Sequence, residues 1–390
     1  MPPETNKKKH DLTCYLPRRT MWTPVSSDGV SRASSLVSAG ERKRKCEHVQ
    51  RQSQRVAIPK GPKIKMDRLG KKVIENVKTF NSVNCDWPRY ASKVRTRSHI
   101  HPQVESIQHP AAAFLAALRD YGAPVFMDDD AWDVDLLRAR AHRGPHQSTK
   151  AYADFVCDEM ADFDDKSFWT VLPLEILLTH VKNLRLSPLG CVPQRDRRPR
   201  LINDLTFYGI NDHTIRLAPL AAMQFGHALD RILQRIRDAD PRHGPVYMAK
   251  VDIADGFYRI DVAAEMAPIL VVILPFSEGE DPLVAIPLAL PMGWTESPPL
   301  FCALTKTVPD MANARTHQVA WPHRLEDQAE SQAINAPPVV QRPYHEGYES
   351  LPTPSHAATA KLSKKLAYFD VFVDDYLALA QGSQRDRRRI

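Results

Sequence analysis

The chain has 390 residues, enough for two or three domains, and its 53 Lys and Arg against 46 Asp and Glu give a formal net charge of +7. This basic excess favours a polyanionic partner such as nucleic acid. The six cysteines form no C-x-x-C pair, which argues against a zinc knuckle and a disulfide framework. The longest apolar run, PILVVILPF at 268–276, is far shorter than a membrane span, and the N-terminus lacks a signal peptide. These features predict a soluble intracellular protein, in cytoplasm or nucleus, with no membrane partner.

Residues 1–105 are rich in Lys, Arg, Ser and Pro and show no sustained periodicity. Such a segment buries too little apolar surface to offset the entropy cost of ordering, so we expect a disordered basic leader. Its ERKRK run at 41–45 has two interpretations that the sequence leaves open, a nuclear-import or nucleic-acid patch and a solvated tail.

Helical patterns follow the leader. Residues 106–184 read as a helical extension, with one helix over 109–122 and a second after Ser148 or Thr149, either of which can cap it. A third helix is predicted from Pro219 to about Asp238. The apolar stripes of these helices indicate core packing and no chemistry.

Strand patterns dominate the next part of the chain, which makes the fold class α+β. β-rich runs occupy 246–253, 269–274 and 283–290, and the acidic segment 277–282 predicts the turn between the last two. The Pro-rich stretch 310–362 has little periodicity and is too long for a compact loop, so it predicts a disordered insertion within a domain.

Three aspartates carry the chemical signal. Asp374 and Asp375 lie between two short apolar runs, where two residues suit a tight hairpin loop, and an ordinary surface turn is the plain interpretation. Asp252, however, directly follows another β-rich run. Carboxylates from neighbouring strands repel each other unless a cation lies between them, and Mg²⁺ prefers carboxylate oxygens. The pattern therefore predicts a divalent-metal site.

Four blocks in order resemble the reverse transcriptases of retrotransposon polyproteins, over roughly residues 185–308 and 366–382. The blocks are VPQRDRRPRLINDLTFYGIN (192–211), KVDIADGFYRI (250–260), LPMGWTESPPLFCALT (290–305) and VFVDDYLAL (371–379). They are similar to the fingers block, motif A, motif B and the Y-x-D-D box of motif C. One such block would be a weak match, whereas four in the family's order are specific.

The resemblance implies a right-hand polymerase fold with fingers and palm, in which an antiparallel palm sheet is flanked by helices. It places the fingers at 185–245 and the palm at 246–309 and 363–390, with 310–362 inserted in the palm. The chain ends soon after the Y-x-D-D-like box, so a thumb is expected to be absent. The implied function is RNA-directed DNA polymerisation on an RNA template and a DNA primer, with deoxynucleoside triphosphates as substrates.

The same resemblance assigns roles to the acids. Asp252, Asp374 and Asp375, helped by the carbonyl of Ile253, would hold two Mg²⁺ ions, with Mn²⁺ as an alternative. The primer 3′-hydroxyl then attacks the α-phosphate of the nucleotide as pyrophosphate leaves.

Substrate-binding roles follow from the other blocks. Arg200 matches the fingers arginine that binds the triphosphate, and Arg195 is a candidate for a second phosphate contact. Phe257 stands at the steric gate that excludes a 2′-hydroxyl. Gly293 would let the backbone approach the nucleotide, and Met292 stands where many relatives carry glutamine.

Two other functions remain open from the sequence. One is a non-catalytic nucleic-acid-binding remnant of a transposable element, held by phosphate contacts alone. The other is a metal-dependent nuclease built on the same acids.

Overall fold

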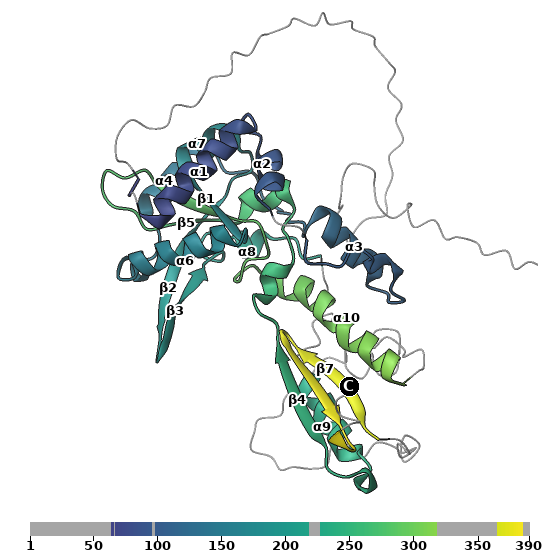
Figure 1. Ribbon diagram of the computed structural model, residues 1–390. Coiled ribbons are helices and arrows are strands. Elements are labelled where there is room, and N and C mark those ends of the chain that lie inside the picture. Colours follow the sequence, from purple (N-terminus) through teal and green to yellow (C-terminus); the bar gives the residue numbers. More distant parts are fainter. Residues whose placement is uncertain (1–63, 66, 96–97, 218–226, 318–364, 385–390) are drawn as a thin grey trace, which may run out of the picture.

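The computed structural model describes residues 64–65, 67–95, 98–217, 227–317 and 365–384, and this part of the chain has a mixed α/β architecture with two sheets (Figure 1). The predicted mixture of helices and strands is confirmed at this level. None of the helices in the described ranges is both long and apolar enough to cross a membrane.

The larger sheet has five strands in the order β1-β6-β5-β2-β3. β2 and β5 are parallel, and the other neighbours are antiparallel. β1 and β5 are buried along their whole length, which their unbroken apolar runs require. The strands are β1 (Trp169–Pro173), β2 (Leu186–Gln194), β3 (Arg197–Asn203), β5 (Val271–Ile273) and β6 (Leu283–Pro287).

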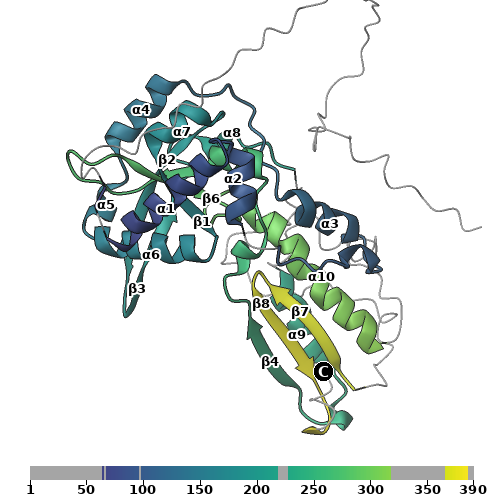
Figure 2. The ribbon, with the colours of Figure 1, turned by 45° about the horizontal axis from the view of Figure 1, so that its top comes forward.

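Helices from residues 68–213 surround this sheet (Figures 1 and 2). They are α1 (Arg68–Ser82), α2 (Trp87–Val94), α4 (Val134–Arg143), α5 (Gln147–Lys150), α6 (Ala153–Asp165), α7 (Leu174–His180) and α8 (Ile210–His213). α6 agrees with the predicted second helix, but neither expected cap is used. Ser148 and Thr149 both belong to α5, and the Ser148 Oγ accepts from the Cys191 N–H at 3.2 Å.

The predicted disordered leader is wrong for residues 68–94. Val73, Val77 and Phe80 repeat at helical spacing and are buried in the core, and the Asp67 carboxylate caps α1 by accepting from the Gly70 N–H at 2.9 Å. Tyr90 in α2 bonds to Thr170 of β1 at 2.6 Å. Because the segment is rich in Lys and Arg, its overall composition outweighed this apolar spacing in the prediction. Residues 1–63 lie outside the described ranges.

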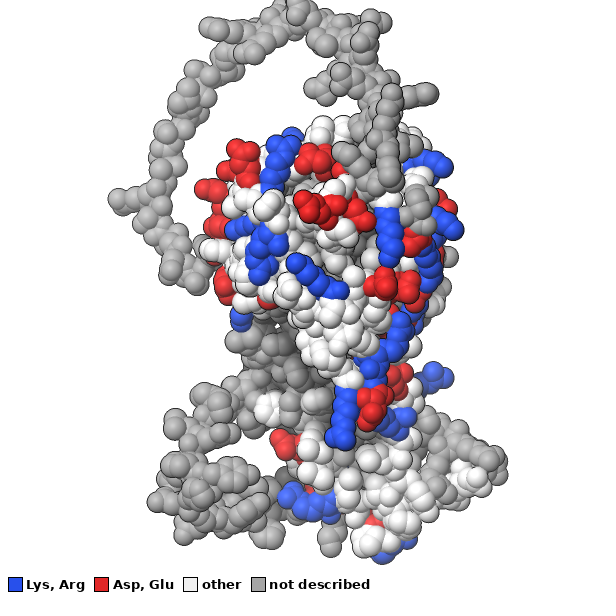
Figure 3. All heavy atoms as spheres, turned by 90° about the vertical axis from the view of Figure 1, so that its left-hand side faces the viewer, with Lys and Arg blue, Asp and Glu red and all other residues white. Residues whose placement is uncertain are grey.

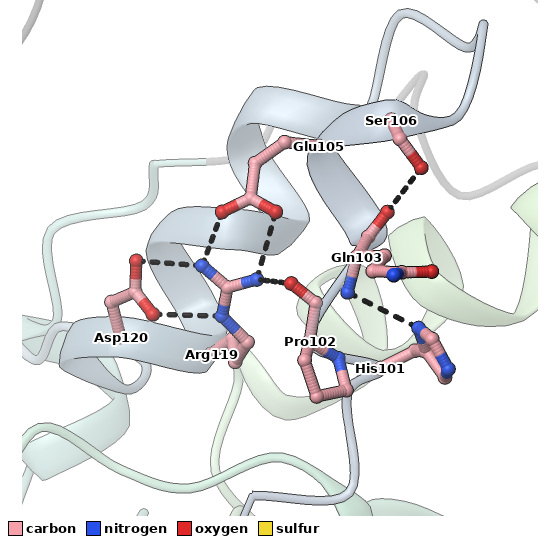
Figure 4. A network of polar contacts seen from close by, with 7 residues as sticks. All are labelled: His101, Pro102, Gln103, Glu105, Ser106, Arg119 and Asp120. Atoms are coloured by element: carbon pink, nitrogen blue, oxygen red, sulfur yellow. Dashed lines mark hydrogen bonds and ion pairs between the residues drawn. The ribbon is translucent and has the colours of Figure 1, made fainter.

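The predicted helix over 109–122 is confirmed as α3 (Ala112–Tyr121), which ends at Gly122. Arg119 near its end ties α3 to the short helix η2 (Val104–Ser106) through Glu105 and to the Pro102 carbonyl before it, and also bonds to Asp120 of α3 (Figure 4). The Glu105 contact to one guanidinium nitrogen measures 2.9 Å. This contact lowers the pKa of Glu105 to about 2.

The smaller sheet has three antiparallel strands in the order β4-β8-β7. They are β4 (Tyr247–Asp252), β7 (Ala367–Phe372) and β8 (Asp375–Ala380). The predicted strand over 246–253 and the predicted C-terminal hairpin are both confirmed. The short 3-10 helices η5 (Pro241–His243), η6 (Gly256–Arg259) and η7 (Ala264–Leu270) complete the connections.

Two helices cover opposite faces of the smaller sheet. From α9 (Ala228–Asp238), Arg231 forms a two-pronged ion pair with buried Asp370 at 2.7 and 2.8 Å. From α10 (Ser297–His317), the Thr305 carbonyl accepts from the Tyr376 hydroxyl at 3.2 Å. Since Asp370 is opposite Leu377 in the register, and successive residues of a strand point to opposite faces, the helices lie on opposite sides. Figure 2 shows α10 running along β7 from the larger part of the molecule.

Several predicted boundaries need correction. The runs at 269–274 and 283–290, expected in the palm, form β5 and β6 and join the five-stranded sheet, because their continuous apolar sequence needs cover on both faces. α9, expected in the fingers, packs on the three-stranded sheet. The segment 106–184, expected to be a purely helical extension, also contains strand β1. Residues 310–317 continue α10, so they are not part of a disordered insertion. Residues 218–226 and 318–362 lie outside the described ranges.

Candidate metal centre

Three aspartates from separate parts of the chain meet at one end of the three-stranded sheet. Asp252 ends β4, Asp375 begins β8, and the two are direct partners in the antiparallel register. Asp374 lies in the turn just before β8. Carboxylate oxygens of all three residues lie within 4.8 Å of one another. The expected convergence of these acids is therefore observed.

The turn differs from the predicted loop by one residue. Its two residues are Val373 and Asp374, and Asp375 already pairs within β8. Val373 has a φ of 59°, a left-handed conformation that is unusual for a β-branched residue. The Asp374 carbonyl accepts from the Ile253 N–H at 3.1 Å, which fixes the turn against the end of β4. Ile253 therefore lies beside the three acids. That its carbonyl oxygen binds a metal ion stays a prediction.

Lys250 belongs to this site and was missed in the sequence. It lies two residues before Asp252 on the same strand face, and its Nζ is 2.6 Å from Asp375 Oδ2. The hydrogen bond to Asp375, reinforced by the charge of that carboxylate, raises the pKa of Lys250. In β4 one residue, Val251, separates Lys250 from Asp252, and this spacing could have predicted that the two side chains share a strand face.

The donor set fits a hard divalent cation. Three carboxylates supply oxygen ligands, and the residues are exposed or half-buried, which keeps them accessible. A second group of Asp128, Asp129 and His213 also has its ligand atoms within 4.8 Å of one another. There His213 already contacts Asp128 at 2.9 Å and Arg185 contacts Asp129 at 2.7 Å. Its donors are therefore largely engaged within the protein.

The predicted steric-gate residue borders the acidic turn. The Phe257 ring is half-buried, with its centroid 4.8 Å from that of Phe301 in α10. A Cβ on neighbouring Gly256 would lie 2.8 Å from Phe301 and 3.6 Å from the Asp374 Cβ. Tyr258 points into the core, where it stacks on Phe168 at 4.5 Å. Phe257 thus packs on the buried Phe301 ring, next in the chain to Gly256, which approaches Asp374.

The fingers block and motif B meet on the larger sheet. Arg200 in β3 donates to Met292 Sδ at 3.6 Å, and Asn203 Nδ2 donates to the Met292 carbonyl at 2.8 Å. Gly293 has a φ of +104°, and a Cβ there would lie 2.4 Å from the Asn203 carbonyl oxygen. The backbone at Gly293 was expected to approach a nucleotide, but it closely approaches the Asn203 backbone of the same chain. These side chains contact one another, and none of their contacts in the described residues reaches the acids.

Arg195 stands at the tip of the β2–β3 hairpin with 96% of its side chain exposed. Its contact with Asp196 is long, at 3.8 Å, whereas Arg198 pairs with Glu159 at 2.6 Å. Figure 3 views the molecule from the side on which this hairpin projects, and Lys and Arg side chains, interspersed with Asp and Glu, run down the right of that face. The arginines of the hairpin are therefore open to a polyanion.

No protein-family model and no curated protein matches the chain. A functional assignment therefore depends on the order of the motifs and on the geometry of the acids.

Proposed function

We propose that this chain is the fingers and palm of an RNA-directed DNA polymerase, with the three-stranded sheet as palm and the five-stranded sheet as fingers. The observation that carries this proposal is the meeting of Asp252, Asp374 and Asp375 within 4.8 Å at the end of β4 and β8. An isolated surface turn would not need a third acid from a strand more than a hundred residues away in the sequence.

In this proposal the three acids hold Mg²⁺, for which Mn²⁺ can substitute. When bound, such ions activate an attacking hydroxyl and stabilise the leaving oxygens in phosphoryl transfer. The protein itself contributes positioning: the register of β4 and β8 fixes Asp252 against Asp375, and the Ile253–Asp374 hydrogen bond fixes the turn. Half-buried Phe257, supported from behind by buried Phe301, would give the sugar of a nucleotide an apolar neighbour near the acidic turn.

The fingers residues support binding of the phosphates. Arg200 is exposed on β3, and its guanidinium can donate paired hydrogen bonds to phosphate oxygens. Contact with Met292 links it to the start of motif B, so the two blocks that the resemblance assigns to nucleotide binding are adjacent. Arg195 at the hairpin tip is free to move toward a second phosphate.

Primer extension tests the proposal. The purified full chain should extend a DNA primer on an RNA template with Mg²⁺, and Asp374→Asn should lower the rate about 100-fold or more, because a metal ligand is lost. Asp128→Asn is the matched control, since Asp128 lies in the other acidic group. Equal extension by the wild type and Asp374→Asn would contradict the proposal.

A second candidate is a non-catalytic nucleic-acid-binding protein, favoured by the exposed arginines of the hairpin and by the net charge of +7. Retained binding of template–primer with no extension under Mg²⁺ or Mn²⁺ would support this candidate. Shortening of the primer would instead indicate the nuclease.

A further inference from the structure

Cations and aromatic rings pack together on the larger part of the molecule, and two of the rings, Phe207 and Tyr208, lie in the 192–211 block, where the resemblance gives them no role. The Arg140 guanidinium lies between two rings, 3.4 Å from the Trp132 centroid and 4.2 Å from the Tyr208 centroid. Phe207 meets Tyr208 edge-on at 4.8 Å, and the Arg143 guanidinium lies 4.1 Å from the Phe207 centroid. We call these five residues the cation–aromatic row.

Hydrogen bonds fix both ends of the loop after β3, which carries Phe207 and Tyr208 of the row. The Asp204 carboxylate accepts from the Phe207 N–H at 3.0 Å, and its other oxygen contacts His146 at 2.9 Å. Farther along, Asn211 donates to Thr206 at 2.9 Å and to the Gly293 carbonyl at 2.8 Å. A loop held this way presents its rings with little loss of conformational entropy on binding.

One end of the row is enclosed and the other is open. Arg140 is half-buried, one of its terminal nitrogens has no hydrogen-bond partner among the described residues, and burial lowers its pKa. Phe207, by contrast, is 45% exposed, and Arg143 is exposed beside it. A rigid ring with a guanidinium next to it, both facing solvent, offers an aromatic surface and a phosphate contact at the same point.

The open end continues onto the β2–β3 hairpin. The His146 ring lies 5.1 Å from that of Phe207, and its Cδ2 would be 3.5 Å from a Cβ on Gly190 in β2. Gly190 pairs with Ile202 and shares a strand face with Val192, whose partner is Arg200. Ile202 and Val192 are 39% and 49% exposed. An exposed face therefore leads from Phe207 to Arg200, which contacts Met292.

We propose that Phe207 and Arg143, continued by the exposed face of the β2–β3 hairpin, bind single-stranded nucleic acid. An unpaired base stacks on the Phe207 ring, and Arg143 binds a neighbouring phosphate. Stacking of this kind accepts any base, and it discriminates against a duplex, whose bases are already stacked within it. The inference deepens the proposed function by assigning a site for the unpaired strand, but binding there requires neither metal nor nucleotide.

The test measures fluorescence anisotropy of labelled oligo-dT and oligo-rU of about 20 nucleotides with the full chain in EDTA. At about 0.15 M salt, Phe207→Ala should weaken binding of both roughly tenfold, whereas Phe207→Trp should retain it. Tyr121→Ala is the matched control, because Tyr121 is 48% exposed on α3 and should leave affinity unchanged.

The salt dependence of oligonucleotide binding tests the role of Arg143. Arg143→Gln should reduce the slope of log affinity against log salt by about one, as expected for one lost phosphate contact. Arg138→Gln on the same helix is the control, since Arg138 already pairs with Glu175 at 3.1 Å and should leave the slope unchanged.

Three results would overturn the inference: wild-type affinity in Phe207→Ala, equal binding of a duplex of the same length, or a Phe207→Ala effect confined to self-association in sedimentation. The experiments distinguish an error in this binding site from an error in the proposed polymerase function. Normal primer extension with unchanged oligonucleotide affinity in Phe207→Ala would exclude the site alone. Loss of affinity in Phe207→Ala, with no extension by the wild type, would exclude the polymerase alone.

Discussion

Asp252 and Asp375 are directly opposed residues in the antiparallel pairing of β4 and β8. Like charges at such a position destabilise a sheet. Asp374 adds a third carboxylate within 4.8 Å, and among the described residues Lys250 supplies a compensating cation at 2.6 Å from Asp375. The arrangement is therefore one that a further cation would stabilise.

Lys250→Met should tighten divalent-metal binding about two- to fivefold, because the ammonium that competes for Asp375 is lost from an exposed pair. Titration with Mn²⁺ followed by electron paramagnetic resonance measures this without any activity. Lys166→Met is the control, since Lys166 makes a similar exposed pair with Asp255 at 3.3 Å. Weaker binding in Lys250→Met would instead mean that Lys250 supports the acids.

Phe257→Val should let the polymerase accept ribonucleotides. Shortening the ring opens space beside Phe301 and Asp374 for a 2′-hydroxyl, so the ratio of ribonucleotide to deoxyribonucleotide incorporation should rise about tenfold or more. Single-nucleotide extension gives the ratio. Phe276→Val, at a half-buried ring in the larger part, serves as control. An unchanged ratio in Phe257→Val would remove the gate assignment.

Gly293→Ala should be more destabilising than Gly279→Ala. Both glycines have positive φ, +104° and +84°, but a Cβ at Gly279 meets nothing within 4 Å, whereas one at Gly293 lies 2.4 Å from the Asn203 carbonyl oxygen. We expect a loss in unfolding free energy of about 1 kcal/mol for Gly279→Ala and about 3 kcal/mol for Gly293→Ala. Urea denaturation checks the difference; equal losses would show that the loop shifts freely.

Arg231→Met should lower the unfolding free energy by about 3 kcal/mol, because it removes the two-pronged ion pair of the buried Asp370 carboxylate. Adding Asp370→Asn should recover part of the loss, since the neutral amide oxygen can still accept from the Val371 N–H while its Nδ2 donates to the Tyr368 hydroxyl, which replaces the second carboxylate oxygen. Denaturation of the single and double variants measures the coupling. Additive losses would mean that the pair does not act as a unit.

The pair of Glu105 and Arg119 should contribute to stability only above acidic pH (Figure 4). Hydrogen bonding to Arg119 lowers the pKa of Glu105 from 4.5 to about 2, so the folded state holds the proton less tightly than the unfolded state. The stabilisation is therefore complete above about pH 5 and is lost as pH falls toward the folded pKa. The difference in Tm between wild type and Glu105→Gln should shrink from about pH 6 to about pH 3. Since half of Glu105 is exposed, the effect is small; a difference constant with pH would contradict it.

The sequence by itself determined the local features of the candidate site. β-rich runs of strand length predicted β4 and the β7–β8 hairpin, and the positions of Asp252, Asp374 and Asp375 along them put the acids at strand ends. Local periodicity predicted the hairpin but not its register: the turn is Val373–Asp374, one residue earlier than expected, and the pairing of Phe372 with Asp375 fixes which residues are opposed. The helices α3 and α6 were predictable for the same reason, since their apolar stripes depend on spacing alone.

Only the tertiary structure decided which sheet each strand joins and which side chains complete the site. The apolar runs of β5 and β6 suit any buried sheet, and pairing of β5 with β2 placed them outside the three-stranded sheet. Lys250 reaches Asp375 because β4 and β8 are neighbours, and Phe207 meets Arg143 because two segments more than sixty residues apart pack together. Such contacts depend on long-range burial of apolar surface, which local sequence patterns do not encode.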